Sequence, residues 1–147
     1  MVERFEKFSY FISEISRNWH KIASDVMGRY GLKGPYSVYF TALHRYSEGL
    51  TATRLGEICS RDKADVSRAI SLMEKKGLVV KEGTNYRAIL KLTKEGEDVA
   101  EQIKNNAEAA VEYGGKGLTN EQREMFYEAL GVICENLQQL SKDGLEK

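Results

Sequence analysis

The sequence has few of the residues that build metal centres, disulfide frameworks or catalytic sites. Its 147 residues include two cysteines, Cys59 and Cys134, and two histidines, and their spacing matches no zinc site or disulfide framework. A nucleophile elbow and a glycine-rich phosphate loop are also missing from the sequence. We therefore expect no metal, no cofactor and no enzymatic activity, and the small number of cysteines favours a reducing, cytoplasmic location.

Long apolar runs are missing as well. No window of the sequence approaches the about 18 apolar residues that would suggest a transmembrane helix. The first residues, MVERFEKFSYF, are charged and have a helical pattern, whereas an export signal has a basic region followed by an apolar one. We expect neither export nor a membrane partner.

Net charge is also missing, because 22 basic residues balance 22 acidic ones. The distribution is more informative than the total. Residues 61–91 carry eight basic and four acidic side chains, a net charge of +4, whereas residues 97–147 carry five basic and eleven acidic ones, a net charge of −6. A polyanion would therefore bind the middle of the chain and avoid its last third.

Amphipathic helices are expected at both ends of the chain. Apolar residues recur at alternating steps of three and four over residues 5–26, and again over residues 126–140 after a capping box from Thr119 to Gln122. Such heptad seams need partner helices, which a second copy or the same subunit could supply. We expect a dimer interface that contains Phe5, Phe8, Ile12, Ile15, Phe126, Leu130, Ile133, Leu137 and Leu140.

Three short helices are expected in the middle of the chain, over residues 36–46, 51–59 and 62–76. Thr51 and Asp62 are suited to cap the second and third of these, and Gly77 to end the third. The second and third match a helix-turn-helix arrangement, although the polar face of the third could also be ordinary solvated surface. That face consists of small and basic residues that fit a DNA groove: Lys63, Ala64, Ser67, Arg68 and Ser71.

A β-hairpin should follow the third helix. Two β-prone runs, residues 78–81 and 86–92, flank turn residues Gly83 and Asn85. Its position directly after the helix favours a wing that contacts adjacent phosphates or the minor groove, with Lys81 and Arg87 near its tip; a simple connecting hairpin is the alternative. Thr93 should cap the helix that comes next.

Three segments of the middle region, LTATRLGEI, DKADVSRAISLMEKKGLV and RAILKLTKEGE, resemble the MarR family of bacterial winged-helix regulators. The flanking helices agree with the family in number and order. The resemblance implies a mainly α (α+β) fold, with a dimerisation helix at residues 1–30, a winged helix-turn-helix DNA-binding domain at 36–96 and dimerisation helices at 97–147. One departure is that the family's wing often ends in Asp-Arg-Arg, whereas this one has Asn85-Tyr86-Arg87.

The pattern and the resemblance together predict a sequence-specific, double-stranded-DNA-binding transcriptional regulator that binds a near-palindromic operator as a homodimer. The resemblance places the third middle helix in the major groove and Arg87 in the minor groove. The expected DNA-contact residues are Arg61, Lys63, Ala64, Ser67, Arg68, Ser71, Lys81 and Arg87. A winged helix that serves only as a protein-interaction scaffold is the alternative.

Many proteins of that family are repressors released by small aromatic effectors, so the resemblance also implies an effector site. Aromatic and titratable groups are expected near the junction of the first helix and the DNA-binding domain, and they come from Trp19, His20, Tyr39 and His44. For Cys59 we favour a buried structural thiol. A thiol-based redox regulator is a minor alternative, in which Arg61 and Lys63 would lower the pKa of Cys59.

Overall fold

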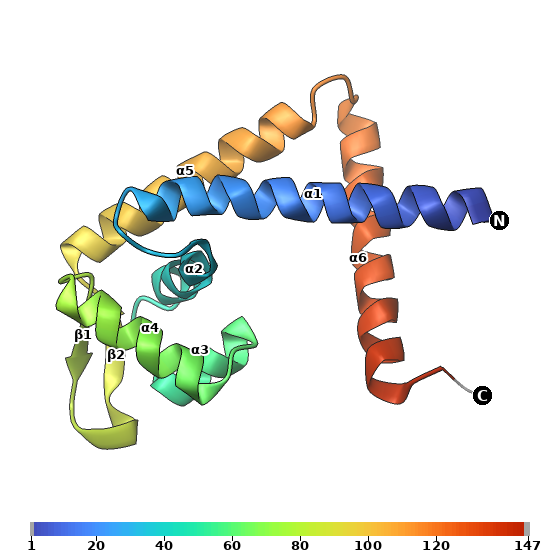
Figure 1. The fold of residues 1–147 in the computed structure, drawn as a ribbon. Helices are drawn as coiled ribbons and strands as arrows, with labels where there is room; N and C mark the ends of the chain where they lie inside the picture. Colours follow the sequence, from blue (N-terminus) through green and yellow to red (C-terminus); the bar gives the residue numbers. More distant parts are fainter. Residues whose placement is uncertain (1, 146–147) are drawn as a thin grey trace. The chain divides into compact units, whose positions relative to one another are not determined.

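The computed structural model describes residues 2–145 and is mainly helical (Figure 1). It contains two compact units, residues 1–108 and 109–147, and the boundary between them falls within one helix. Within the described residues the elements are α1 (Val2–Gly28), η1 (Gly34–Tyr36), α2 (Ser37–Arg45), α3 (Ala52–Cys59), α4 (Lys63–Lys75), β1 (Val79–Glu82), η2 (Asn85–Arg87), β2 (Ile89–Leu92), α5 (Lys94–Gly114) and α6 (Asn120–Asp143).

The predicted caps are the residues at which four helices begin. Thr51, Asp62, Thr93 and Thr119 each accept a hydrogen bond from the backbone N–H three residues further on, at donor–acceptor distances of 2.7–3.2 Å. Gln122 completes the capping box by accepting from the backbone N–H of Thr119 at 2.9 Å. These side chains satisfy N–H groups that have no partner inside their own helix, so the boundaries predicted from them are confirmed.

One hydrophobic core holds the first unit together. Helices α2, α3 and α4 pack on one another and on the hairpin, and the end of α1 and the start of α5 close the core from the other side (Figure 1). Large buried side chains from each of these elements meet there, including Met27, Phe40, Leu55, Met73, Leu90 and Val99. The left-handed backbone of Ser60 makes the tight turn from α3 to α4. The predicted helix-turn-helix is confirmed.

The predicted hairpin is also confirmed, although its second strand begins at Ile89, and residues 86 and 87 of the expected run belong to η2. Strands β1 and β2 pair antiparallel from Val79 opposite Leu92 to Glu82 opposite Ile89. Gly83 and Asn85 both have positive φ, the conformation expected of turn residues. Leu50 forms an isolated antiparallel bridge with β2, because its backbone exchanges two hydrogen bonds with that of Leu90 at 2.8 and 3.1 Å. The hairpin is thus fastened to the loop that precedes α3.

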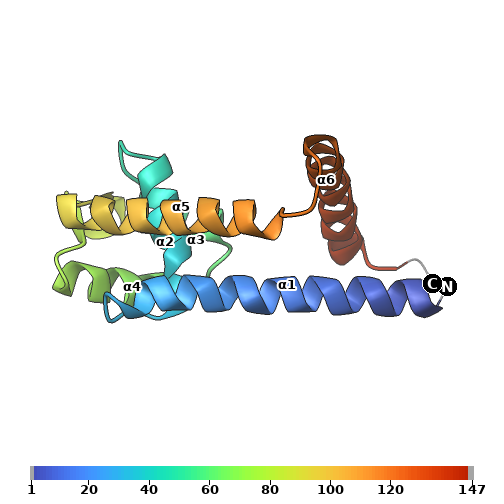
Figure 2. The same cartoon turned by 90° about the horizontal axis from the view of Figure 1, so that it is seen from above.

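Helix α1 extends well beyond the core of the first unit. Its last two turns contribute Val26 and Met27 to the core, and in the view of Figure 2 helix α2 lies between α1 and α5. The earlier turns of α1 expose a row of apolar side chains: Phe5, Phe8, Ile12, Ile15 and Trp19. No helix among residues 2–145 is long and apolar enough to cross a membrane.

The second unit consists of the end of α5, a turn and α6. Arg123 holds the turn, because its guanidinium pairs with Glu112 at 3.0 Å and donates to the carbonyl oxygen of Gly115 at 2.9 Å. Helix α6 exposes apolar side chains along its length, among them Phe126, Ile133, Leu137 and Leu140, with Leu130 half-buried.

The start of α5 lies close to the segment that joins α4 to β1. A Cβ at Gly96 would stand 2.0 Å from the carbonyl oxygen of Leu78 and 3.1 Å from the side chain of Leu92. We therefore expect Gly96→Ala to lower the free energy of unfolding by about 1–3 kcal/mol, as overpacking does. Urea denaturation monitored by circular dichroism measures this change in the free energy of unfolding.

The matched control is Gly28→Ala. A Cβ at that helical residue would have open space around it, with no packed neighbour from residues 2–145 within 4 Å. Its stability should equal or exceed that of the wild type, since alanine favours a helix more than glycine does. Equal stability of the two variants would contradict the close approach at residue 96.

Candidate functional site

Helix α4 presents a face of small and basic side chains to solvent. Its buried residues Val66, Ala69, Ile70 and Met73 face the core. The predicted reading residues Lys63, Ala64, Ser67, Arg68 and Ser71 are all exposed on the other side. Short side chains around one arginine leave room for the helix backbone to approach a groove, while the guanidinium can reach base edges or phosphates.

A buried tyrosine holds the first turn of α4. The hydroxyl of Tyr39 on α2 donates a hydrogen bond to Oδ2 of Asp65. The other oxygen of Asp65 lies 3.9 Å from Nη2 of Arg68. Burial, and then the hydrogen bond to Asp65 and its negative charge, raise the pKa of Tyr39 well above its ordinary value, so the hydroxyl keeps its proton.

The hairpin carries two more predicted contact residues. Lys81 and Arg87 are both exposed, and Arg61 is half-buried in the turn before α4. Nζ of Lys81 pairs with the carboxylate of Glu74 on α4 at 3.1 Å, so this lysine links β1 to the helix. Its charge is therefore partly neutralised within the chain.

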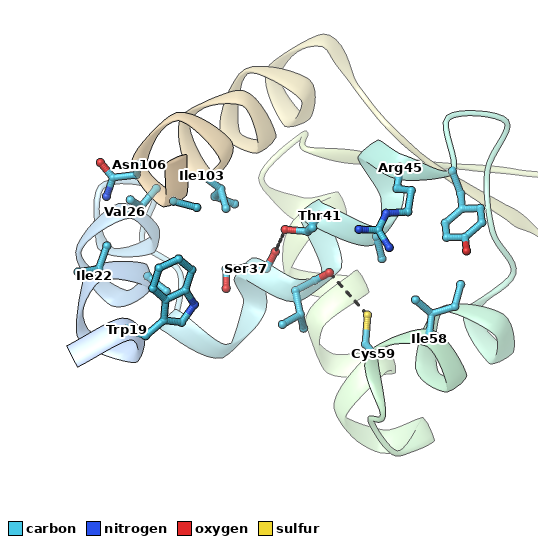
Figure 3. Close-up of a pocket in the computed structure, with 15 residues that line it drawn as sticks. Trp19, Ile22, Val26, Ser37, Thr41, Arg45, Ile58, Cys59, Ile103 and Asn106 are labelled. Carbon is cyan, nitrogen blue, oxygen red and sulfur yellow. Dashed lines mark hydrogen bonds between the residues drawn. The ribbon is translucent and has the colours of Figure 1, made fainter. Parts of the chain in front are cut away.

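A mainly apolar cavity lies among α1, α2, α3 and α5 of the first unit (Figure 3). Its volume is about 480 Å³, which is within the range of small-molecule sites. Three of the polar residues on its wall, Ser37, Thr41 and Arg45, come from α2. The lining residues are Trp19, Ile22, Ala23, Val26, Ser37, Val38, Thr41, Ala42, Arg45, Tyr46, Ile58, Cys59, Ile103, Asn106 and Ala107.

Of the four residues predicted to bind an effector, the cavity brings in only Trp19. Tyr39 is 1% exposed in the core and bonded to Asp65. Nδ1 of His44 lies 2.6 Å from the carboxylate of Glu97 on α5, and His20 is exposed beside Ser16. The expected grouping of His20, Tyr39 and His44 with Trp19 is thus corrected.

The physical reason is helical periodicity. Successive helical residues are about 100° apart around the axis, so the lining residues of α2 recur on one side of the helix and Tyr39 and His44 lie outside that side. Ser37, Thr41 and Arg45 are spaced four apart and form the stripe of α2 on the cavity wall. That spacing is visible in the sequence and could have identified them.

Cys59 lies on the wall of the cavity, half-buried at the end of α3 (Figure 3). Its thiol donates to the carbonyl oxygen of Val38, with Sγ 3.6 Å away. Burial raises the pKa of Cys59, and the opposing effect of Arg61 is smaller. This environment agrees with the favoured prediction of a buried structural thiol. The minor alternative, in which nearby cations lower this pKa, is wrong because desolvation outweighs them. Among residues 2–145, no group of three or more histidine, cysteine or acidic side chains could hold a metal ion.

The fold is similar to that of solved proteins described as MarR-family regulators. A transcriptional regulator from Listeria monocytogenes, solved in complex with 26mer DNA, is 24% identical with a TM-score of 0.76, covering 94% of this chain and 95% of its own. A regulator from Methanosarcina mazei is 21% identical, with a TM-score of 0.78 and 92% of each chain covered.

A third similar structure is MepR, a transcription regulator of the multidrug efflux pump MepA in Staphylococcus aureus. It is 19% identical with a TM-score of 0.71, covering 88% of this chain and 98% of its own. No protein-family model and no curated protein sequence matches the chain. At these identities the likeness shows the fold, a winged helix-turn-helix flanked by long helices.

The environment of Cys59 predicts slow alkylation. Iodoacetamide should modify Cys59 about tenfold or more slowly than exposed Cys134 near neutral pH, because burial limits access and raises the pKa of the Cys59 thiol. The rate at Cys59 should continue to rise into alkaline pH, where its thiolate forms. Mass spectrometry of peptides over a time course measures both sites at once. In denaturant the two rates should converge, and faster reaction of Cys59 in the folded protein would contradict the structure.

Proposed function

We propose that this protein is a MarR-type transcriptional regulator that binds double-stranded DNA in a sequence-specific manner through α4. The observation that carries the proposal is the exposed face of α4 around Arg68, which combines small side chains with one long cation. The similar fold of a regulator solved with DNA supports it. Regulation of transcription in the cytoplasm, without enzymatic activity, is the corresponding role.

The proposed contacts differ in what they do. Arg68, Ser67 and Ser71 read base edges in the major groove, while Ala64 lets the helix backbone approach. Arg61 and Lys63 contact phosphates at the start of α4, and Arg87 on the hairpin reaches the minor groove or its phosphates. Lys81 contributes positive charge next to them, reduced by its pairing with Glu74.

We further propose that the protein acts as a homodimer. The apolar rows of α1 and α6 are exposed in a single chain and need covering, which a second copy can supply. In this assignment residues 1–30 and 97–147 make the dimer, and residues 36–96 bind DNA. Two DNA-binding domains related by twofold symmetry fit half-sites about 34–36 Å apart, and hence a near-palindromic operator.

The cavity is the proposed site of a small aromatic effector that releases a repressor from DNA. Trp19 offers a flat apolar surface, and exposed Arg45 on the cavity wall can pair with a carboxylate. The cavity lies against α2, which packs on α3, the first helix of the helix-turn-helix. An aromatic acid bound there would therefore alter the support of the DNA-binding helices.

The DNA proposal predicts an enriched sequence from random duplexes. Wild-type protein should select a near-palindrome, and Arg68→Ala should lose affinity for it by about 1–3 kcal/mol because a base contact is removed. Wild-type affinity should fall by about 10³ to 10⁵ between 50 and 200 mM salt if about six to ten phosphates are engaged. Sedimentation of the protein used should give the mass of a dimer.

The matched control is Arg17→Ala on α1. Like Arg68, Arg17 is exposed and has an acidic residue three positions earlier, Glu14. It should bind the selected duplex as the wild type does. If wild-type protein enriches no sequence, the DNA-binding proposal fails and the scaffold alternative is favoured.

The effector proposal predicts binding of a phenolic acid such as 4-hydroxybenzoate, measured by calorimetry. Arg45→Gln should weaken binding about tenfold or more because the carboxylate loses its cation. Arg54→Gln, which alters an exposed arginine of α3 that is not part of the cavity wall, is the control. The bound acid should also lower the affinity for the selected duplex. Equal binding by the two variants, or no binding by the wild type, would refute the proposal that the cavity binds an aromatic acid through Arg45.

A further inference from the structure

Tyr39 is a buried residue that the proposed contacts leave unused. Its side chain is almost fully enclosed, yet its hydroxyl reaches the first turn of the DNA-reading helix and bonds to Asp65. We propose that Tyr39 is a positioning residue for base recognition: by holding Asp65, it determines where the guanidinium of Arg68 stands on the DNA-facing surface. This inference rests on the proposed function of α4.

The two oxygens of Asp65 have different neighbours. Oδ2 accepts from the hydroxyl of Tyr39, whereas Oδ1 lies 3.9 Å from Nη2 of Arg68. The side chain of Asp65 is 28% exposed and that of Arg68 is 68% exposed. One carboxylate therefore joins a rigid group in the core to a flexible group at the surface.

This arrangement limits where Arg68 can go. An exposed arginine has many rotamers, and fixing them on binding costs conformational entropy. A carboxylate that is held by Tyr39 through its other oxygen favours the rotamers that keep the guanidinium nearby, at the start of α4. The separation of 3.9 Å is long for an ion pair, so the guanidinium can leave Asp65 for a base edge at small cost.

Tyr39 itself is well fixed. It lies on α2 with 1% of its surface exposed, and its ring packs against that of Tyr36 with the centroids 6.0 Å apart. The hydrogen bond crosses from α2 to α4, which are separate elements of the core. The position of Asp65 therefore depends on tertiary packing as well as on the helix that carries it.

The same hydrogen bond also restrains the position of the Asp65 carboxylate. A carboxylate on a DNA-facing surface repels phosphates, and a mobile one can accept a hydrogen bond from cytosine N4. Bonding to Tyr39 draws one oxygen of Asp65 towards α2. Loss of the hydroxyl should free Asp65 to compete with Arg68 and so change the base preference near Arg68, in addition to weakening binding.

The experiment uses the full chain and the duplex selected by the wild type, with four proteins: wild type, Tyr39→Phe, Arg68→Ala and the double variant. Tyr39→Phe should weaken operator binding by about three- to thirtyfold in the wild-type background and have little effect in the Arg68→Ala background, which is the coupling expected of groups acting as one unit. Selection with Tyr39→Phe should give altered preferences at the positions that Arg68→Ala also affects.

Tyr30→Phe is the matched control, because it removes a hydroxyl from another tyrosine packed against the core, one that belongs neither to the DNA-contact face nor to the cavity wall. It should leave affinity and base preference unchanged. Thermal unfolding of each variant checks the folded fraction at the binding temperature. Asp65 is partly exposed and can bond to water when the hydroxyl is removed, so Tyr39→Phe is expected to fold.

Three outcomes would overturn the inference. Unchanged affinity and preference in Tyr39→Phe would show that Arg68 does not need this anchor. An equal loss in both backgrounds would mean that Tyr39 acts through general stability, as would a loss that follows the folded fraction. These results differ from failure of the proposed function, in which the wild type itself selects no sequence.

Discussion

The burial of one face of α4 is the constraint on which the rest of the structure depends. Val66, Ala69, Ile70 and Met73 must leave water, and α2, α3 and the hairpin are the surfaces that receive them. Because a helix has a fixed periodicity, burying this face determines which residues remain outside. The position of Arg68 at the surface is thus a result of core packing, and the proposed chemistry of DNA recognition depends on the same packing.

The sequence was sufficient where structure depends on local chemistry. Capping side chains, glycines with positive φ and helical periodicity act over a few residues, so Thr51, Asp62 and Gly77 predicted the boundaries of α3 and α4 correctly. The exposed face of α4 followed from its periodicity. The hairpin followed from its turn residues, Gly83 and Asn85.

The sequence was insufficient where contacts join distant segments. Tyr39 and Asp65 are 26 residues apart, and His44 and Glu97 are 53 apart, so no local pattern relates them. The cavity was placed only approximately for the same reason, since its wall combines four helices. At Cys59 a buried thiol was the favoured prediction, and the structure adds that burial outweighs the neighbouring Arg61 in setting its pKa.

Helix α2 has one further consequence. Ser37 and Thr41 lie on the cavity wall, while Tyr39, between them in sequence, points into the core and bonds to α4. Both sets of side chains extend from the same nine-residue helix. Rotation of α2 about its own axis would therefore displace the cavity wall and the Tyr39 hydroxyl in the same motion. The volume of the cavity and the attachment of α4 therefore both depend on the orientation of one short helix.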